Sequence, residues 1–237
     1  MWTISNIMMI IQNASDYLKD DIPRSEWVFA LLILPVLIYL IVSLKESYSL
    51  NTIIRIVFSN KYANNVYRNS TPGVEVFQLL LGALSLLSIP TFILFAEFHF
   101  NLHFYHLNPF LLWLFNLVVI SLAILSRYIV NLAIGSLSRS SDAFREYFFN
   151  ISHGYKLMGI MLMIVNFFIS YLISIPDRYI IFFSLIMISV IYLLRIIRLI
   201  YIFLKRRFSL FYLILYLCTL EFFPALILLR YLSGQDY

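Results

Sequence analysis

Residues 179–200 read YIIFFSLIMISVIYLLRIIRLI, and this stretch decides the fold class of the chain. It carries no charge before Arg195. At 1.5 Å per residue, a helix of this length measures about 33 Å, enough to cross a hydrocarbon core of about 30 Å. Backbone N–H and C=O groups in lipid must be satisfied within their own segment, so we expect a transmembrane helix here.

Five further apolar blocks of similar length lie on either side of this stretch. We therefore predict an all-α, polytopic membrane protein with six transmembrane helices and additional amphipathic interfacial helices. We find no internal repeat and no linker, so residues 1–237 are expected to form a single membrane domain. The predicted spans are 27–44, 76–96, 110–126, 157–175, 179–200 and 208–229.

The composition agrees with this fold class. Of 237 residues, 62% are hydrophobic and 12% are charged, whereas soluble domains average about 45–50% and about 25%. A water-soluble enzyme, a disordered chain and a disulfide-rich module are excluded on these grounds, and the single Cys218 forms no internal disulfide. The net charge of +5 comes from residues that flank the apolar blocks, so no nucleic-acid partner is expected.

The basic residues predict the orientation. The loops and helix ends after spans one, three and five hold 13 of the 17 Lys and Arg residues. Basic loops stay in the cytoplasm, so both termini are expected on the outer side of the membrane. The 13 residues are Lys45, Arg55, Lys61, Arg68, Arg127, Arg139, Arg145, Lys156, Arg195, Arg198, Lys205, Arg206 and Arg207.

Two segments outside the spans have an amphipathic helical pattern. Residues 1–18 lack the basic start and cleavage site of a signal peptide, and we expect a helix on the outer interface. Residues 50–62 place apolar side chains at helical spacing opposite Arg55 and Lys61, which predicts an interfacial helix on anionic head groups. Because Ile56 interrupts the polar face, packing of this helix against a partner helix is the alternative interpretation.

The loop between spans three and four also has helical character. Residues 128–137 are apolar enough to continue the third helix beyond the membrane, and Ser141 is suited to start a new helix. We expect His153 and Gly154 to break that helix before span four.

The segment LYLCTLEFFP at 215–224, together with FSNKY at 58–62 and the stretch 127–147, resembles an uncharacterised family of small inner-membrane proteins of Bacteroidota. The family is known only as a domain of unknown function. The resemblance implies a bacterial inner membrane, a fold of several helices and no established activity. It also implies that the Glu and Pro of the family's last helix correspond to Glu221 and Pro224.

Glu221 lies well inside the sixth predicted span, where an ionised carboxylate is costly and such groups usually face the bundle interior. A proton or cation relay, or a contact with substrate, is one interpretation. The other is a structural hydrogen bond or an ion pair with Arg127 or Arg195. Pro224 cannot donate a hydrogen bond to the carbonyl of Leu220, so we expect a kink beside this acid.

Three of the four histidines, His99, His103 and His106, follow Glu97 between spans two and three. At helical spacing they would share a face that suits Zn²⁺ or Cu²⁺, with Glu97 or water completing the shell. A pH-sensitive patch and an ordinary aromatic interface are the alternatives, because Phe and Tyr residues separate the histidines.

Other polar residues predict lipid binding and packing. The cluster Arg195, Arg198, Lys205, Arg206 and Arg207 is suited to lipid phosphate groups or an acidic partner, or it only anchors the topology. The remaining candidates, expected to support interhelical hydrogen bonds or close helix contact, are Asn116, Asn166, Gln78, Gly82, Ser85 and Ser88.

No phosphate-binding loop, nucleophile elbow or zinc-protease motif occurs, so a non-enzymatic protein is expected. Our first hypothesis is a subunit or scaffold of an envelope assembly, with a membrane-protein partner or a second copy of the chain. The alternatives are a small proton-coupled or lipid/ion transporter that uses Glu221, and a metal- or haem-handling protein. Apart from such a metal, no cofactor is expected, and the bilayer itself is a partner.

Overall fold

The computed structural model describes residues 25–44, 50–59, 62–63, 65–66, 75–100, 108–137, 141–172 and 176–205. No strand occurs in these ranges, which agrees with the prediction of an all-helical chain. The named helices are α2 (Glu26–Ser43), α3 (Leu50–Phe58), α5 (Glu75–His99), α6 (Pro109–Leu137), α7 (Ser141–Tyr171) and α8 (Asp177–Lys205).

Five of these helices are long and apolar enough to cross a membrane, and they correspond to the first five predicted spans. The sixth predicted span, 208–229, lies outside the described residues. The structural spans are Glu26–Ser43, Val76–His99, Pro109–Ile129, Ile151–Tyr171 and Asp177–Arg198.

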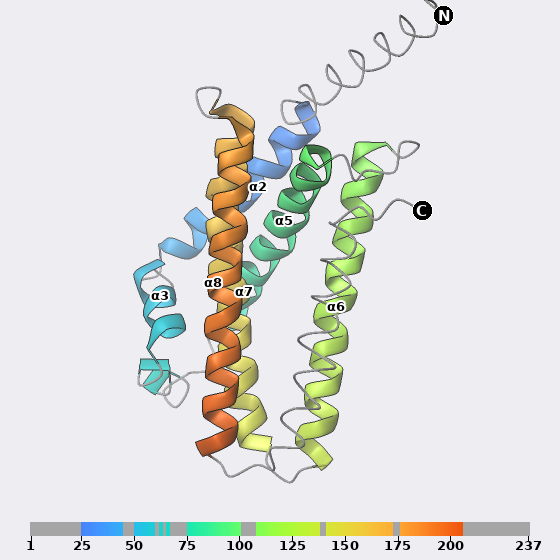
Figure 1. Cartoon of the computed structure of the whole chain (residues 1–237). Coiled ribbons are helices and arrows are strands. Elements are labelled where there is room, and N and C mark those ends of the chain that lie inside the picture. The colour runs from blue at the N-terminus through green and yellow to red at the C-terminus, as the bar shows by residue number, and fades with distance from the viewer. Residues whose placement is uncertain are drawn as a thin grey trace, which may run out of the picture.

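The five long helices alternate in direction (Figure 1). Helices α2, α6 and α8 run toward one end of the bundle and α5 and α7 run away from it, and α6, α7 and α8 extend farthest toward that end. We call this the basic end, because Arg127, Lys156, Arg195 and Arg198 lie on the parts of α6, α7 and α8 nearest to it. The opposite end holds the start of α2, α6 and α8, with the acidic residues Glu26 and Asp177.

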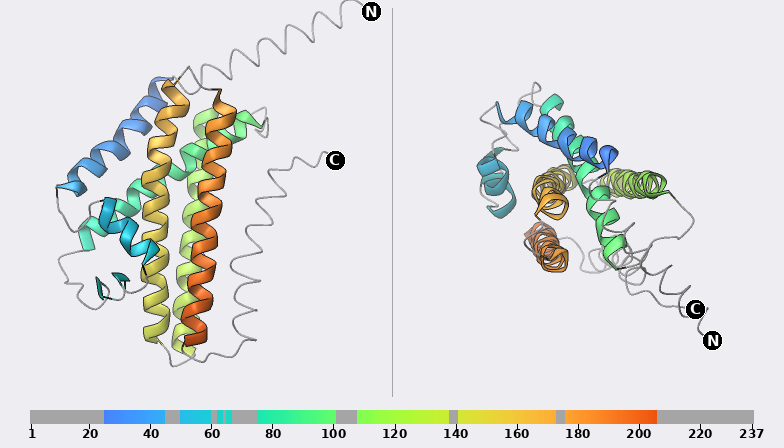
Figure 2. Two further views of the ribbon diagram at one scale, coloured as in Figure 1. Left: turned by 60° about the vertical axis from the view of Figure 1, so that its left-hand side comes forward. Right: turned by 90° about the horizontal axis from the view of Figure 1, so that it is seen from above.

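Helix α5 crosses the middle of the bundle, with α2, α6 and α7 around it (Figure 2). Its most extensive partner is α7. Two buried apolar clusters hold these helices together, one toward each end. Near the basic end Leu81 and Leu84 of α5 pack with Leu157 and Ile160 of α7. Toward the opposite end the shared cluster consists of Ile89, Phe92 and Phe95 of α5 with Leu162, Val165 and Ile169 of α7.

The closest approach of α5 and α7 occurs where both carry small residues. A Cβ atom built on Gly159 would lie 2.5 Å from Cβ and 2.6 Å from Cα of Ser85, so only glycine fits there. Ser85 was predicted to permit close contact, and this is confirmed. Gly82 was expected to do the same, but a Cβ atom there would meet nothing within 4 Å. The glycine that the contact requires is therefore Gly159 of α7, which faces Ser85, and not Gly82 of α5.

Helices α6 and α7 both extend beyond the length of a membrane span at the basic end. α6 continues without a break to Leu137, which confirms the predicted continuation over 128–137. α7 begins at Ser141 as predicted, but the expected break at His153 and Gly154 is wrong, because the helix is continuous to Tyr171. A glycine inside a helix costs only about 1 kcal/mol, and His153 is buried in this packed helix with its Nδ1 2.8 Å from the carbonyl oxygen of Phe149.

Helix α3 packs into the bundle, so the alternative that Ile56 left open is the one observed. Ile53 and Ile56 are 1% and 3% exposed, and Ile53 belongs to the cluster that includes Leu157 and Ile160 of α7. The apolar face, which an interfacial helix would turn toward lipid, instead covers α7 near the basic end.

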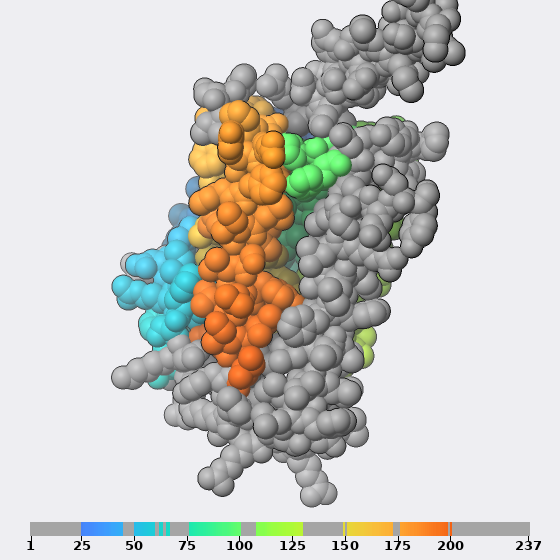
Figure 3. Space-filling model, in the orientation of Figure 1, coloured from blue at the N-terminus to red at the C-terminus, as the bar shows by residue number. Residues whose placement is uncertain are grey.

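Helix α8, unlike α3, leaves large apolar side chains exposed on the molecular surface. The helix is seen on the surface in Figure 3. Its outward face carries large apolar side chains, including Phe183, Ile186 and Leu193, each more than half exposed. Contiguous apolar surface of this kind suits a lipid environment. Together with the five apolar helices, it supports a membrane-embedded protein.

Candidate functional site

Three spans each contribute one polar side chain to a common point near the basic end. Arg127 of α6 donates a hydrogen bond from Nη1 to the hydroxyl oxygen of Tyr155 on α7, at 2.6 Å. The guanidinium carbon of Arg195 on α8 lies 5.1 Å from the centroid of the Tyr155 ring, in cation–π geometry. Tyr155 therefore links two arginines that are far apart in sequence.

Both arginines lie close to the basic-end limit of their spans. At 1.5 Å per residue, Arg127 is about 27 Å along α6 from Pro109, and Arg195 is about 27 Å along α8 from Asp177. The hydrocarbon core is about 30 Å thick, so these side chains reach the depth where acyl chains meet head groups. Long basic side chains at this depth keep their charge in contact with polar surroundings.

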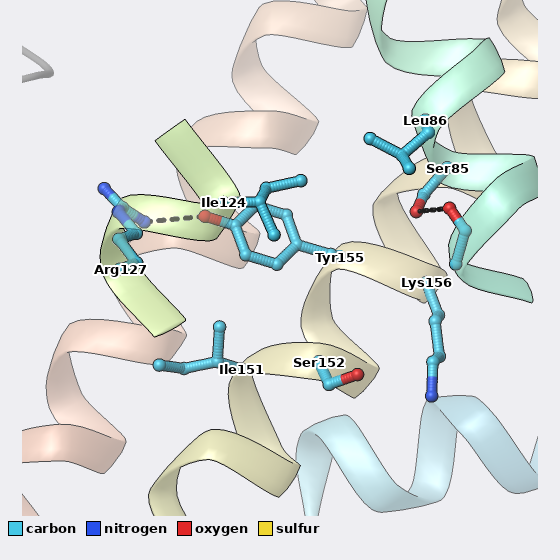
Figure 4. A pocket seen from close by; sticks show the side chains of 9 residues that line it. Ser85, Leu86, Ile124, Arg127, Ile151, Ser152, Tyr155 and Lys156 are labelled. Carbon is cyan, nitrogen blue, oxygen red and sulfur yellow. Dashed lines mark hydrogen bonds between the residues drawn. The ribbon is translucent and has the colours of Figure 1, made fainter. Parts of the chain in front are cut away.

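A cavity of about 120 Å³ lies directly beside this point, between α5, α6 and α7 (Figure 4). Arg127 and Tyr155 form one side of it, and Ser85 and Lys156 lie on another (Figure 4). The full lining consists of Gly82, Ser85 and Leu86 from α5, Ile124 and Arg127 from α6, and Ile151, Ser152, Tyr155 and Lys156 from α7.

A second cavity of about 220 Å³ adjoins the first and shares Ile124, Arg127 and Tyr155 with it. Its other lining residues are mostly apolar and lie farther from the basic end: Ile89, Ile120, Ala123, Ser126 and Met158. The two cavities together form what we call the Arg127 groove, which is mainly apolar and carries Arg127 where the two cavities meet.

Two further basic side chains, Lys156 and Arg198, lie on α7 and α8 apart from the contact of Arg127 with Tyr155. Lys156 is 3% exposed, and Arg198 of α8 donates hydrogen bonds from Nη1 to the carbonyl oxygens of Ile56 (3.0 Å) and Val57 (3.3 Å). A cation at these last carbonyls of α3 satisfies the helix C-terminus and its dipole. The carboxylates whose side chains the structure describes, Glu26, Glu97 and Asp177, lie toward the opposite end of the bundle.

A second buried polar pair lies near that opposite end. Glu97 is 1% exposed, and its Oε2 accepts a hydrogen bond of 2.8 Å from Nδ2 of Asn116 on α6. One turn away, Nε1 of Trp113 donates to Oγ1 of Thr91 at 3.1 Å. The prediction of an interhelical hydrogen bond from Asn116 is confirmed. Glu97, expected in a loop beside the histidines, lies inside α5 and faces the bundle interior.

Asn166 makes the other predicted interhelical bond. Its Nδ2 donates to the carbonyl oxygen of Ser88 at 2.9 Å, in the buried contact between α5 and α7. Among the described residues, the buried atoms Oδ1 of Asn166, Oγ of Ser88 and Oγ of Ser170 have no hydrogen-bond partner. This buried part of the bundle therefore contains more polar side-chain atoms than its hydrogen bonds satisfy.

Several predicted site residues lie outside the described part of the chain. His99 ends α5 with its ring 5.1 Å from that of Phe100, and no group of three metal-binding side chains occurs within the described ranges. Lys205 is the last residue of α8, and its side chain lies outside the described part of the structure. The residues beyond the described ranges are His103, His106, Arg206, Arg207, Glu221 and Pro224.

Sequence analysis selected Arg127, Arg195 and Arg198 but missed Tyr155 and gave Lys156 only a role in topology. Tyr155 is one of 17 tyrosines in the chain, and nothing in its neighbourhood marks it. Only the continuity of α7 supplies a signal, because it places Tyr155 and Lys156 within the candidate span Ile151–Tyr171, where polar groups are rare and need partners.

Residues 28–232 match the model of a family described as "Domain of unknown function (DUF4271)". No curated protein and no solved structure matches the chain.

Proposed function

We propose that this chain, which belongs to the DUF4271 family, is a small non-enzymatic transporter of an anionic lipid or ionic substrate in a bacterial inner membrane. One observation carries the proposal. Arg127 and Arg195, from two different spans, meet on Tyr155 beside a cavity inside the bundle.

The physical argument is that charged side chains in a span are costly and are retained where they meet a ligand, a partner or a polar path. A guanidinium group recognises phosphate and carboxylate through several N–H donors at once. Arg127 donates a hydrogen bond to the Tyr155 hydroxyl and Arg195 lies against the ring of the same tyrosine. Two guanidinium groups from different spans therefore meet beside the cavity, which favours an anion.

The proposed placement in the membrane follows the distribution of basic residues. The basic end would face the cytoplasm, with both termini on the periplasmic side. Under this proposal the groove opens at the depth of the cytoplasmic head groups. Glu221, in a Glu-x-x-Pro sequence with Pro224, would supply the carboxylate that exchanges protons during transport.

The other hypotheses stay predictions with less support. A subunit or scaffold role relied on two amphipathic segments suited to docking, and one of them, α3, is packed against α7. Metal or haem handling relies on His103 and His106, which lie outside the described residues. A test of partners by gentle extraction and native mass spectrometry would still separate a scaffold from a chain that works alone.

The experiment is a comparison of ligand stabilisation in arginine variants. Purified protein is titrated with inorganic phosphate, sulfate and citrate while its unfolding temperature is measured. A ligand at 100 times its Kd stabilises the folded state by about 2.7 kcal/mol. We expect such an upward shift in the wild type and its loss in Arg127→Gln and Arg195→Gln.

Arg178→Gln is the matched control, because Arg178 lies at the start of α8, at the opposite end of the bundle. Arg127→Lys, which keeps the charge but not the planar donor set, should keep a reduced shift. Equal shifts in Arg127→Gln, Arg195→Gln and Arg178→Gln would contradict the proposal, as would the absence of any response to an anion in the wild type.

A further inference from the structure

The Arg127 groove is mainly apolar and carries Arg127 where its two cavities meet. Toward the middle of the span its walls include Ile89, Ile120 and Met158. Ile120 lies seven residues before Arg127 on the same helix, which is about 10 Å at 1.5 Å per residue. An apolar groove therefore extends from a point at which Arg127 supplies a positive charge.

The apolar part of the groove also reaches the surface of the bundle. Ala123 and Ser126 line the second cavity and are both exposed on α6. Their exposure lies within the membrane-spanning part of α6, which ends at Ile129. A molecule could therefore enter from the side, out of the bilayer, without crossing the basic end.

The size of the groove limits how much of a ligand it holds. The two cavities have volumes of about 120 Å³ and about 220 Å³. These volumes accept a short length of one acyl chain and not a whole lipid. The remainder of a chain would lie on the apolar outer face of α6, where Val119 and Leu122 are exposed.

We propose that the groove binds an anionic amphiphile, with its phosphate or carboxylate at Arg127 and an acyl chain along Ile120 and Ile124. This inference rests on the proposed function and names its substrate class. Charge complementarity selects the head group, because Arg127 lines both cavities and Arg195 lies against the ring of Tyr155, which lines them too. The apolar walls and the lateral opening select an attached chain over a free anion.

The test measures which lipid stays bound to the purified protein. The protein is reconstituted with phosphatidylglycerol and phosphatidylcholine in equal amounts, and retained lipids are identified by native mass spectrometry. We expect retention of phosphatidylglycerol over phosphatidylcholine. Loss of a hydrogen bond to a charged group weakens binding by roughly tenfold or more, so Arg127→Gln should lose phosphatidylglycerol to that extent.

A second variant tests the acyl part without touching a charge. Ala123→Trp places a large side chain in the apolar part of the groove from an exposed position, so the fold should tolerate it. We expect this variant to retain about tenfold less phosphatidylglycerol while keeping the response to inorganic phosphate. Arg178→Gln, at the other end of α8, should retain as much as the wild type.

The outcomes separate the two proposals. If inorganic phosphate stabilises the protein through Arg127 but lipid retention is unselective and Ala123→Trp has no effect, the amphiphile is overturned and the proposed function stands. If neither lipid nor phosphate depends on Arg127, both are overturned. Rapid disulfide formation between Ala123→Cys and the native Cys218 would mean that residues of the chain's own predicted sixth span fill the groove, which also overturns the amphiphile.

Discussion

The central helix α5 and the peripheral helix α6 are equally apolar, α7 is less apolar and α8 more so, yet the central pair α5 and α7 and the peripheral pair α6 and α8 have different surroundings. In the most apolar part of each span, 61% of α5 and 56% of α7 is buried inside the bundle, against 17% of α6 and 11% of α8. Hydropathy therefore does not identify the core of this protein. Lipid chains are as apolar as leucine, so burial alone gives no preference for one helix over another.

What distinguishes the central pair is its small and polar residues. Gly159 and Ser85 let the two backbones approach, and the amide of Asn166 bonds to α5 across the contact. The peripheral helices carry large aliphatic and aromatic residues on their outward faces. The comparison indicates that close packing and interhelical hydrogen bonds select the core, as expected for helices in a membrane.

The difference between central and peripheral helices is tested most directly by truncating one phenylalanine in a central helix and one in a peripheral helix. Phe92 of α5 is 3% exposed and Phe183 of α8 is 61% exposed. Phe92→Ala should lower the free energy of unfolding by about 3–5 kcal/mol, because it leaves a cavity that lipid does not fill. Phe183→Ala should change it by less than about 0.5 kcal/mol.

Reversible unfolding in mixed micelles would measure both values. A loss above 2 kcal/mol for Phe183→Ala would mean that the outward face of α8 is covered by protein, and the division into central and peripheral helices would be wrong.

Gly159→Ala is expected to have the next largest effect. The added methyl group would overlap the backbone of Ser85, and such overpacking costs about 1–3 kcal/mol. Gly82→Ala is the matched variant, since a Cβ atom there meets nothing within 4 Å. It should leave stability unchanged or raise it by up to about 1 kcal/mol through helix propensity. Equal destabilisation of the two variants would contradict the proposed contact.

The Glu97–Asn116 bond ties peripheral α6 to central α5, and a double-mutant cycle measures its contribution. Asn116→Leu should cost about 1–2 kcal/mol, since it removes a donor to a buried carboxyl group. In a Glu97→Leu background the same change should cost much less, with a coupling of about 0.6–1.7 kcal/mol. Additive effects would show that the bond contributes no stability.

Apart from the control variants Phe183→Ala and Gly82→Ala, Arg198→Gln should have the smallest effect on global stability. The variant weakens the capping of α3 at the carbonyls of Ile56 and Val57, which is worth about 0.3–1 kcal/mol. The effect should be local, so amide hydrogen exchange over 50–58 should speed up while exchange in α5 stays unchanged. Faster exchange in α5 as well would show that α3 is part of the central packing.

Sequence analysis predicted the individual helices better than their contacts. Periodicity and hydropathy were sufficient for the first five spans, for the continuation of α6 and for the start of α7 at Ser141. Charge inside or directly after an apolar span was sufficient to select Arg195 and Arg127, because such residues are rare in lipid and are recognised easily in a sequence.

The partners of those residues required the tertiary structure. Tyr155 is ordinary in sequence and becomes notable only because α6 and α8 bring an arginine to it. Gly159 and Gly82 look alike along the chain, and only the crossing of α5 and α7 distinguishes them. The amphipathic pattern of α3 fits either lipid or a helix, and the bundle supplies the helix.

The central claim is that the Arg127 groove is a binding site for an anion inside the membrane. An experimental structure of the protein in nanodiscs that contain phosphatidylglycerol tests this claim most directly. We predict head-group density against the guanidinium of Arg127 and chain density along Ile120 and Ile124. A groove filled instead by residues 208–229, with Glu221 paired to Arg127, would contradict it.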